Sequence, residues 1–396
     1  MMLFKPTPLN KEQPILIFAF DFAPLRGGIA KYAYELTRHL HKLGYTLIVL
    51  ARKAPGDQAF DENQPFRIIR MKGVSFRWFR LLPMSFYFVW TVLRHNIRLV
   101  HCINWIPCGF VARLFHLPLR CRFVVTCHGE EITRSLGIPR RLFMLSTFRK
   151  ASWLIAGNNF IREGLNRFAL ETTPISVIGF GVDSDFFRPD LDAEFLRVKY
   201  GSRRKKMLLT VASLKKRKGV DRVLEALHRL KEKGHSQFLY IIIGDGPEKE
   251  NLQTQAQQLG ISEEVIFAGI LSDKDLRFHY CICDCFVMVN REEPVGDIEG
   301  FGIVFIEAAA AEKVTIGGKS GGVPDSIVDG KSGFLVDPND VDKLADKILW
   351  VAEHKNETVE MGRFARKRAI SLFSWGAIAN RTEMIYQNIF ARPRRA

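Results

Sequence analysis

Short apolar segments alternate with amphipathic stretches throughout the chain, and this alternation constrains the fold more than any other feature. A first series of strand-like segments occupies residues 14–20, 46–51, 97–103, 122–128 and 152–158, with a helix-like stretch at 29–44. A second series occupies 205–212, 238–246, 265–270, 284–290 and 313–318. Such alternation favours parallel sheets covered by helices. The sequence therefore predicts an α/β protein with two doubly wound, Rossmann-like units.

The alternation pauses near 181–190, GVDSDFFRPD, where Gly179, Gly181 and Pro189 bracket a polar loop. This pause predicts an N-terminal domain of residues 1–188 and a C-terminal domain of residues 189–374. The helical tail of residues 375–396 is expected to cross back to the N-terminal domain.

The longest uncharged run of the first half, Leu81 to Leu93, is shorter than the ~20 apolar residues of a membrane-spanning helix. With no export signal visible, we expect a cytoplasmic protein whose seven cysteines stay reduced. Cys281, Cys283 and Cys285 alternate, which predicts one buried strand face. A metal site is the alternative, although zinc ligands are usually spaced more widely.

The positive charge is concentrated in the first half of the chain. Residues 1–188 carry 26 Lys and Arg against 12 Asp and Glu, which is +14 of the total net charge of +16. Such a field favours phosphates, anionic lipid headgroups or nucleic acid, although ordinary solubility is an alternative. No nucleic-acid-binding module is recognisable.

Residues 66–98 mix basic and aromatic side chains: Arg67, Arg70, Lys72, Arg77, Arg80, Arg94 and Arg98 with Phe76, Trp78, Phe79, Phe86, Tyr87, Phe88 and Trp90. This mixture is typical of a segment that lies on an anionic membrane surface. A core helix with a solvated basic flank explains it equally well.

Two features of the first half suggest ligand contacts. Gly27 and Gly28 precede a predicted helix, where backbone amides and the helix dipole suit a phosphate. The third glycine of the dinucleotide fingerprint is missing, which counts against a dehydrogenase. His128 follows a strand, at the edge where open α/β sheets bind ligands. It suits either a sugar hydroxyl or a phosphate charge, and a purely structural histidine is the alternative.

Three glycine-containing loops of the second half are candidates for binding a nucleotide. Four consecutive cations, Lys215 to Lys218, follow a strand and precede Gly219, and Lys218 is the best candidate to neutralise a diphosphate. Gly244 and Gly246 form a turn that suits a backbone ledge beneath a nucleotide. Gly321 and Gly322 form a third glycine-containing loop that a nucleotide could approach closely.

The strongest signal is the segment EGFGIVFIE, in which Glu299 and Glu307 flank a predicted helix start near Ile303. The amides of that helix start suit a diphosphate. Glu299 is placed to accept hydrogen bonds from sugar hydroxyls, and Glu307, one turn inside the helix, from the two hydroxyls of a ribose. An acidic loop before an Ala-rich helix is the alternative.

Taken together, these segments resemble the retaining glycosyltransferases of the GT-B fold, over nearly the whole chain. The resemblance implies two Rossmann-like domains facing each other across a cleft, with the acceptor held by the first and a nucleotide-diphosphate sugar by the second. GDIEGFGIVFIEA and HGEE are most similar to bacterial mannosyltransferases that use GDP-mannose, including those that act on phosphoinositide lipids.

The resemblance also implies roles for single residues. Gly28 would touch donor phosphate, His128 the donor sugar, and Lys218 the diphosphate; Glu299 would hold sugar hydroxyls and Glu307 the ribose. The backbone of Phe301, Gly302 and Ile303 would hold phosphate and sugar.

One position departs from the family pattern. Where the family usually has Gly-Arg-Leu, this chain has Ala212, Ser213 and Leu214, so the arginine that pairs with the later lysine is missing. Lys215, Lys216 or Arg217 is expected to replace its charge, or phosphate binding is weaker.

We therefore expect a retaining hexosyltransferase, with mannose as the favoured sugar, that acts on a lipid-linked or cell-envelope acceptor. It needs no cofactor or metal: the Asp183-Ser-Asp185 motif lies in the interdomain segment, and we give it no metal-binding role. It is expected to associate with the inner face of the plasma membrane. The alternatives are a nucleotide-sugar epimerase, which needs no acceptor, and a noncatalytic protein that binds polyanions or membranes.

Overall fold

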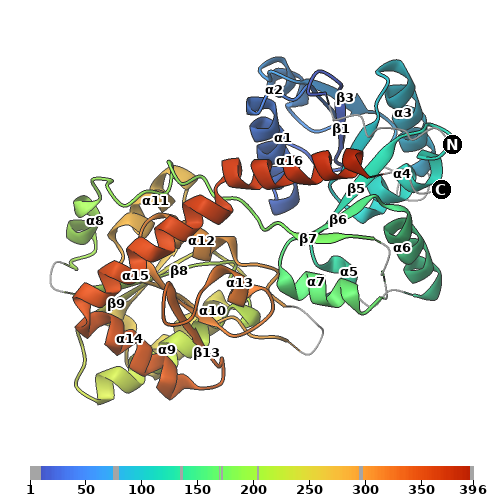
Figure 1. Cartoon of the computed structure of the whole chain (residues 1–396). Coiled ribbons are helices and arrows are strands. Elements are labelled where there is room, and N and C mark those ends of the chain that lie inside the picture. The colour runs from blue at the N-terminus through green and yellow to red at the C-terminus, as the bar shows by residue number, and fades with distance from the viewer. Residues whose placement is uncertain are drawn as a thin grey trace. The chain divides into compact units, whose positions relative to one another are not determined.

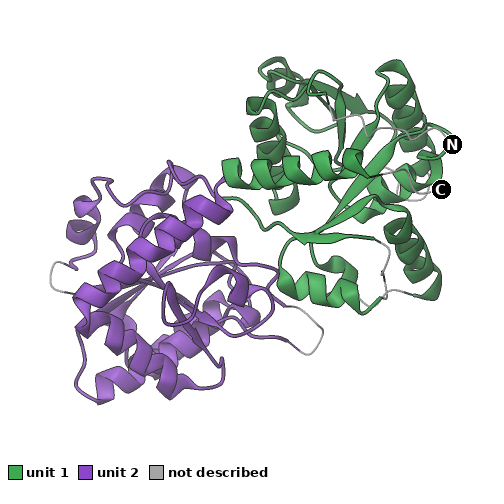
Figure 2. Ribbon diagram, viewed as in Figure 1, with its two compact units in different colours: residues 1–181, 375–396 green, residues 182–374 purple. Residues whose placement is uncertain are grey.

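The computed structural model describes residues 10–74, 80–133, 137–168, 170, 173–202, 205–293 and 298–392. They form two compact units, Met1–Gly181 with Trp375–Ala396, and Val182–Ser374 (Figure 2). Each unit is built on one parallel sheet, as the alternation predicts (Figure 1). The first unit ends at residue 181, whereas the sequence places the boundary at 188.

Unit 1 contains a seven-stranded sheet in the order β3-β2-β1-β4-β5-β6-β7. Its strands are β1 Ile15–Phe18, β2 Leu47–Arg52, β3 Arg67–Met71, β4 Leu99–Cys102, β5 Arg122–Cys127, β6 Trp153–Ala156 and β7 Ile175–Val177. Strand β1 is central and fully buried, with Leu16 and Phe18 in one core cluster and Ile15 and Ile17 in the other. Because β1 is buried on both faces of the sheet, its residues are all apolar and do not alternate with polar ones.

The helices of unit 1 follow its strands and cover both faces of the sheet. They are α1 Gly28–Lys42, α2 Asp57–Glu62, α3 Leu81–Arg94, α4 Phe110–Phe115, α5 Glu130–Thr133, α6 Ile138–Lys150, α7 Asn159–Asn166 and the returning α16 Trp375–Ala391, with a π-helical turn at Trp105–Gly109.

Helix α16 returns to unit 1 from the end of the chain and packs beside α1 (Figure 1). The buried Tyr386 hydroxyl lies 2.7 Å from Nδ1 of His101, and the Tyr45 hydroxyl donates to Glu383 over 3.1 Å. A Cβ on Gly181 would overlap the indole of Trp375, so only glycine fits there. These contacts are the physical reason why the tail belongs to unit 1.

Unit 2 contains a six-stranded sheet in the order β10-β9-β8-β11-β12-β13. Its strands are β8 Lys206–Val211, β9 Phe238–Ile243, β10 Val265–Gly269, β11 Cys285–Met288, β12 Val314–Gly318 and β13 Gly333–Val336. Its helices are α8 Glu194–Lys199, α9 Val220–Glu232, α10 Lys249–Gln258, α11 Asp273–Ile282, α12 Ile303–Ala310, α13 Val323–Ser326, α14 Val341–Glu353 and α15 Lys355–Arg368, with short turns at Lys216–Lys218, Ser262–Glu264 and Ala369–Phe373.

Two local predictions need correction. Cys281 lies in α11, Cys283 ends that helix and only Cys285 enters a strand, so the three do not share a strand face. All three are nevertheless buried free thiols, and the described residues contain no group of three metal-ligating side chains. Residues 66–98 form strand β3 as well as helix α3, while Arg77, Phe76, Trp78 and Phe79 lie outside the described residues.

Candidate active site

The site of unit 2 is built at the point where its strand order reverses. Strands β8 and β11 are neighbours in the sheet but lead to helices far apart in sequence, α9 and α12. The chain therefore leaves their carboxyl ends in different directions. Open α/β sheets bind ligands at such a point. β8 leads to the turn Lys216–Lys218, and β11 leads to Glu299.

A left-handed glycine and an arginine shape the Lys216–Lys218 turn. Gly219 follows it with φ +66° and begins α9. The backbone N–H of Arg291 donates to the Arg217 carbonyl over 2.9 Å, and the Arg291 guanidinium binds both carboxylate oxygens of Asp221 at 3.0 and 2.7 Å. The loop after β11 thus holds the turn after β8 in place.

The carboxylate of Glu299 is the centre of a partly buried ion cluster. Its Oε2 accepts hydrogen bonds from Arg217 Nη1 at 2.6 Å, from Asn290 Nδ2 at 3.1 Å and from Lys218 Nζ. Burial by itself raises the pKa of Glu299. The charges and hydrogen bonds of Lys218 and Arg217 lower the pKa by more than burial raises it, so the net shift is downward. Glu299 is therefore ionised at neutral pH and balances the charge of one of the two cations that it contacts, the buried Lys218 and the partly buried Arg217.

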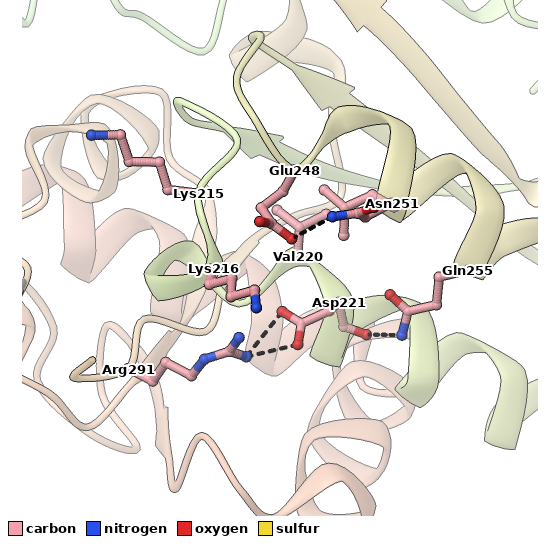
Figure 3. A pocket seen from close by; sticks show the side chains of 9 residues that line it. Lys215, Lys216, Val220, Asp221, Glu248, Asn251, Gln255 and Arg291 are labelled. Carbon is pink, nitrogen blue, oxygen red and sulfur yellow. Dashed lines mark hydrogen bonds and ion pairs between the residues drawn. The ribbon is translucent and has the colours of Figure 1, made fainter. Parts of the chain in front are cut away.

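The other two cations of the run point elsewhere. Lys215 and Lys216 line a small pocket with Val220, Asp221, Glu248, Asn251, Leu252, Gln255 and Arg291 (Figure 3). In Figure 3 the Lys216 amine points towards Asp221 and Arg291, whereas Lys215 points away from the other labelled side chains. Arg217 is thus the residue of the run that adds a second cation beside Lys218. Ser213, which occupies the position of the missing arginine, is exposed.

Glu307 lies in α12 with a partner of its own. The hydroxyl of the fully buried Tyr280, in α11, donates to Glu307 Oε2 over 2.9 Å. Burial and the nearby Glu307 charge raise the pKa of Tyr280 well above its usual value, so this hydroxyl keeps its proton. The two glutamates of the motif are therefore held by different donors.

Glycines shape the backbone around Glu299. Gly302, with φ +74°, begins α12 without any side-chain cap, and Phe301 before it is buried against Phe373. The N–H of Gly322 donates to the Glu299 carbonyl over 3.0 Å, and a Cβ on Gly321 would overlap that carbonyl. The uncapped start at Ile303 leaves this end of α12 suited to an anion.

Packing within unit 2 explains why residues 244 and 246 are glycines. A Cβ at Gly244 would overlap the Ala212 carbonyl, and one at Gly246 would lie 2.7 Å from the Leu214 nitrogen. The Leu214 N–H also donates to the Asp245 carbonyl over 2.9 Å. These glycines thus let the loop after β9 pack against the end of β8.

In unit 1, His128 follows β5 as predicted. Its Nε2 lies 2.7 Å from the Ile103 carbonyl, which can only accept, so Nε2 carries the proton and Nδ1 is an acceptor. Burial lowers the pKa of His128 to about 4. A neutral imidazole of this tautomer suits a sugar hydroxyl better than a phosphate charge.

Glu131 organises the loop that carries His128. Its buried carboxylate accepts the N–H groups of Gly129 at 2.7 Å and His128 at 3.4 Å. Burial raises the pKa of Glu131 to about 7, although these bonds oppose the shift. No sequence signal separates it from its exposed neighbour Glu130.

Replacing Glu131 with glutamine is expected to change the pH dependence of stability. Because the pKa of Glu131 is raised on folding, the native state holds a proton that the unfolded chain releases, and stability falls as the pH rises from about 5 to 7. The fall attributable to this residue is at most about 3 kcal/mol. Urea unfolding at pH 5 and 7 should show it in the wild type and not in Glu131→Gln; equal pH slopes would contradict it.

Gly27 and Gly28 open α1 in unit 1. Gly27 has φ +142°, a conformation that side chains rarely adopt, and a Cβ on either residue would meet nothing within 4 Å. Neither glycine is therefore needed for packing against the described protein.

The structure brings Arg217, Lys218 and Glu299 together and places Glu307 one turn into α12, the helix that follows Glu299. It adds Asn290, Tyr280 and Glu131, which the sequence analysis did not identify, because each is far in sequence from the group it contacts or has no distinctive motif. His128, Gly27 and Gly28 belong to unit 1.

Comparisons with known proteins agree for both units. Residues 192–368 match the family model "Glycosyl transferases group 1", and residues 26–186 match "Glycosyltransferase Family 4". The chain is 30% identical over 377 residues to a GDP-mannose-dependent alpha-(1-6)-phosphatidylinositol monomannoside mannosyltransferase of Mycolicibacterium smegmatis, covering 91% of this chain and 95% of that protein. It is 25% identical to a glycogen synthase of Mycobacterium tuberculosis over 94% of each.

Solved structures show the same fold. A glycosyltransferase from Rickettsia africae has a TM-score of 0.80 at 23% identity and covers 96% of this chain and 98% of its own. Anabaena HepE in complex with UDP has a TM-score of 0.76 at 21% identity, covering 93% and 98%. These structures confirm the GT-B fold. The family model and the mannosyltransferase relative favour a glycosyltransferase over an epimerase or a noncatalytic polyanion-binding protein.

Proposed function

The chain belongs to the group 1 glycosyltransferases, and from that premise we propose that it is a retaining enzyme that moves mannose from GDP-mannose to a lipid-linked or cell-envelope glycan acceptor. The observation that carries the proposal is the partly buried cluster of Arg217, Lys218 and Glu299 beside the uncapped start of α12. Two cations and a helix start near the carboxyl ends of neighbouring strands suit a diphosphate that leaves as an anion.

In this proposal the donor diphosphate is held by Lys218, Arg217 and the backbone of Phe301 to Ile303. Lys218 Nζ has three N–H donors, so it can keep its bond to Glu299 and also bind a phosphate oxygen. Arg217 supplies the charge missing at Ser213. Glu299 holds sugar hydroxyls, and Glu307 holds the ribose.

The reaction follows the route proposed for the family, on one face of the sugar. The bond from the anomeric carbon to the diphosphate oxygen breaks, and its electron pair leaves with the diphosphate. The acceptor oxygen bonds to the same face of that carbon and passes its proton to the departing phosphate. Lys218 and Arg217 stabilise the growing negative charge, which is the main contribution expected of the protein. For two residues of unit 1 the proposal keeps the roles that the family resemblance implies: Gly28 for the donor phosphate and His128 for the donor sugar.

The donor is tested by thermal shift of the full chain against GDP-mannose, UDP-glucose and ADP-glucose. We expect the largest stabilisation with GDP-mannose, because bound ligand stabilises the native state by mass action. A larger shift with a UDP- or ADP-sugar would move the proposal to that donor. No shift with any of the three would contradict the function itself.

We propose that catalysis needs no metal ion. Asp183, the first acid of the Asp-x-Asp motif, accepts the N–H groups of Asp185 at 3.2 Å and Phe186 at 3.0 Å, so its carboxylate organises its own turn. Turnover that survives dialysis against EDTA would support this. Loss restored by Mg²⁺ or Mn²⁺ would contradict it.

An apolar face on three helices of unit 1 supports association with a membrane. Helix α3 exposes one stripe, and α4 packs between α3 and α6 (Figure 1). The exposed apolar residues of this membrane face are Leu82, Phe86, Trp90, Leu93, Leu114, Leu117, Ile138, Leu142 and Phe143. Large exposed apolar side chains on neighbouring helices suit contact with a membrane.

The charge around the membrane face fits anionic lipid. Residues 63–129 contain no Asp or Glu, and neither do residues 137–150. The exposed cations next to the apolar residues are Arg94, Arg120, Arg140, Arg141, Arg149 and Lys150. No helix of the described residues is long and apolar enough to cross a bilayer. We therefore propose that this face rests on the anionic inner surface of the plasma membrane, where a lipid-linked acceptor is found.

Sedimentation with phosphatidylglycerol vesicles tests the membrane face. We expect binding at low salt that weakens at high salt, because lipid charge contributes. Ile138→Glu should weaken it about tenfold, whereas Ile270→Glu, an equally exposed isoleucine of unit 2, should not; both side chains are 78% exposed. No binding at either salt concentration, or equal binding by the two variants, would contradict the proposal.

A further inference from the structure

Tyr280 is a buried polar residue that the proposed function leaves without a role. It lies in α11, 27 positions before Glu307, and its side chain is fully buried. Its ring packs edge-on against Phe187, with centroids 5.4 Å apart, and is tilted against Phe286 at 5.8 Å. These rings fix the direction in which the hydroxyl points.

The hydroxyl meets a carboxylate that needs a defined orientation. It donates to Glu307 Oε2 over 2.9 Å, and Glu307 itself is only 8% exposed. A glutamate side chain loses rotamer entropy when it is ordered. A bond that orders Glu307 before ligand arrives removes part of that cost from binding.

We propose that Tyr280 is a positioning residue for ribose recognition: its hydroxyl holds the Glu307 carboxylate in the orientation that accepts the two hydroxyls of the nucleotide ribose. The inference rests on the proposed function, in which Glu307 binds the ribose. It adds a second residue, on another helix, that determines whether the site distinguishes a ribonucleotide from a deoxyribonucleotide. Tyr280 itself touches no substrate.

The experiment is calorimetric binding of GDP and 2′-deoxy-GDP to the full chain, with UDP and 2′-deoxy-UDP in parallel. The wild type is expected to bind the ribonucleotide at least about tenfold more tightly, because a charged acceptor loses a partner in the deoxy form. Tyr280→Phe is expected to reduce that ratio by about 2- to 10-fold, chiefly by weakening the ribonucleotide.

Tyr240→Phe is the matched control. Tyr240 is also a fully buried tyrosine of unit 2, and its hydroxyl lies 2.7 Å from Thr210 Oγ1 rather than near Glu307. Its removal should leave the ribose-to-deoxyribose ratio unchanged. A merely structural effect of Tyr280→Phe would weaken both nucleotides equally and keep the ratio.

The outcomes separate the inference from its premise. An unchanged ratio in Tyr280→Phe, with a wild type that discriminates, would overturn the role of Tyr280 and leave the ribose role of Glu307 intact. A wild type that binds a nucleoside diphosphate without discriminating would overturn both. A chain that binds neither GDP nor UDP would contradict the proposed function.

Discussion

Lys218→Ala is expected to lower kcat by about 10²–10³-fold while the fold is retained. The side chain ends at Glu299 Oε2, at the start of α12, where the proposal places the departing diphosphate. Without Lys218, the negative charge that develops on the departing diphosphate would no longer be stabilised by a lysine at this position. Glu299→Ala should lose a similar fraction of turnover, because it removes both a sugar contact and the group that positions Lys218 and Arg217. Turnover is measured with saturating donor and an acceptor extract.

Lys216→Ala is the control for this experiment. Lys216 lies in the same short turn and carries the same charge, but its side chain lines the separate pocket of Figure 3. Its removal should change kcat by less than about twofold, since an exposed charge that points towards Asp221 and Arg291 interacts weakly with the Glu299 cluster. Wild-type turnover in Lys218→Ala and Glu299→Ala would refute the assigned roles, and an equal loss in Lys216→Ala would show that net charge alone matters.

The second large effect is expected at Gly219, where alanine should both destabilise unit 2 and abolish most turnover. Gly219 has φ +66°, and an added Cβ would overlap the carbonyl of Val289, at the end of β11. Left-handed strain and a displaced backbone together cost about 2–4 kcal/mol. For a unit of this size we expect Tm to fall by about 5–15 °C in calorimetry. The displaced turn would carry Lys218 away from Glu299.

Gly234→Ala separates strain from overlap. Gly234 also has a left-handed φ, +88°, but a Cβ there would meet nothing within 4 Å. It should cost only the conformational strain, about 1 kcal/mol, and leave turnover intact. Equal Tm shifts in the two variants would mean that contact with Val289 is not what requires glycine at 219.

Much of the fold is predictable from the sequence, because strands buried on both faces are apolar throughout and the helices between them are amphipathic. All ten strand-like segments contain a strand of the structure, and the helix predicted near Ile303 begins there. Strands β3, β7 and β13 are not predicted, because they are short or interrupted by polar residues such as Arg67 and Arg70. The cysteine alternation misleads because α11 ends only at Ile282.

Within the candidate site, the sequence identifies the groups but not their partners. Glu299, Glu307 and Lys218 stand in motifs whose spacing carries the prediction. No such motif identifies the residue that replaces the missing arginine, because Lys215, Lys216 and Arg217 are equivalent in sequence. Only the short turn before Gly219 gives Arg217 the direction that brings it to 2.6 Å from Glu299.

The order of residues alone thus determined the two α/β units, the acidic pair around a helix start and the uneven charge, because periodicity and local motifs depend on neighbours along the chain. Tertiary structure alone decided that Tyr280 meets Glu307 and that Asn290 meets Glu299. Those pairings join segments that only the packing of helices on sheets brings within hydrogen-bonding distance, and no local pattern encodes them.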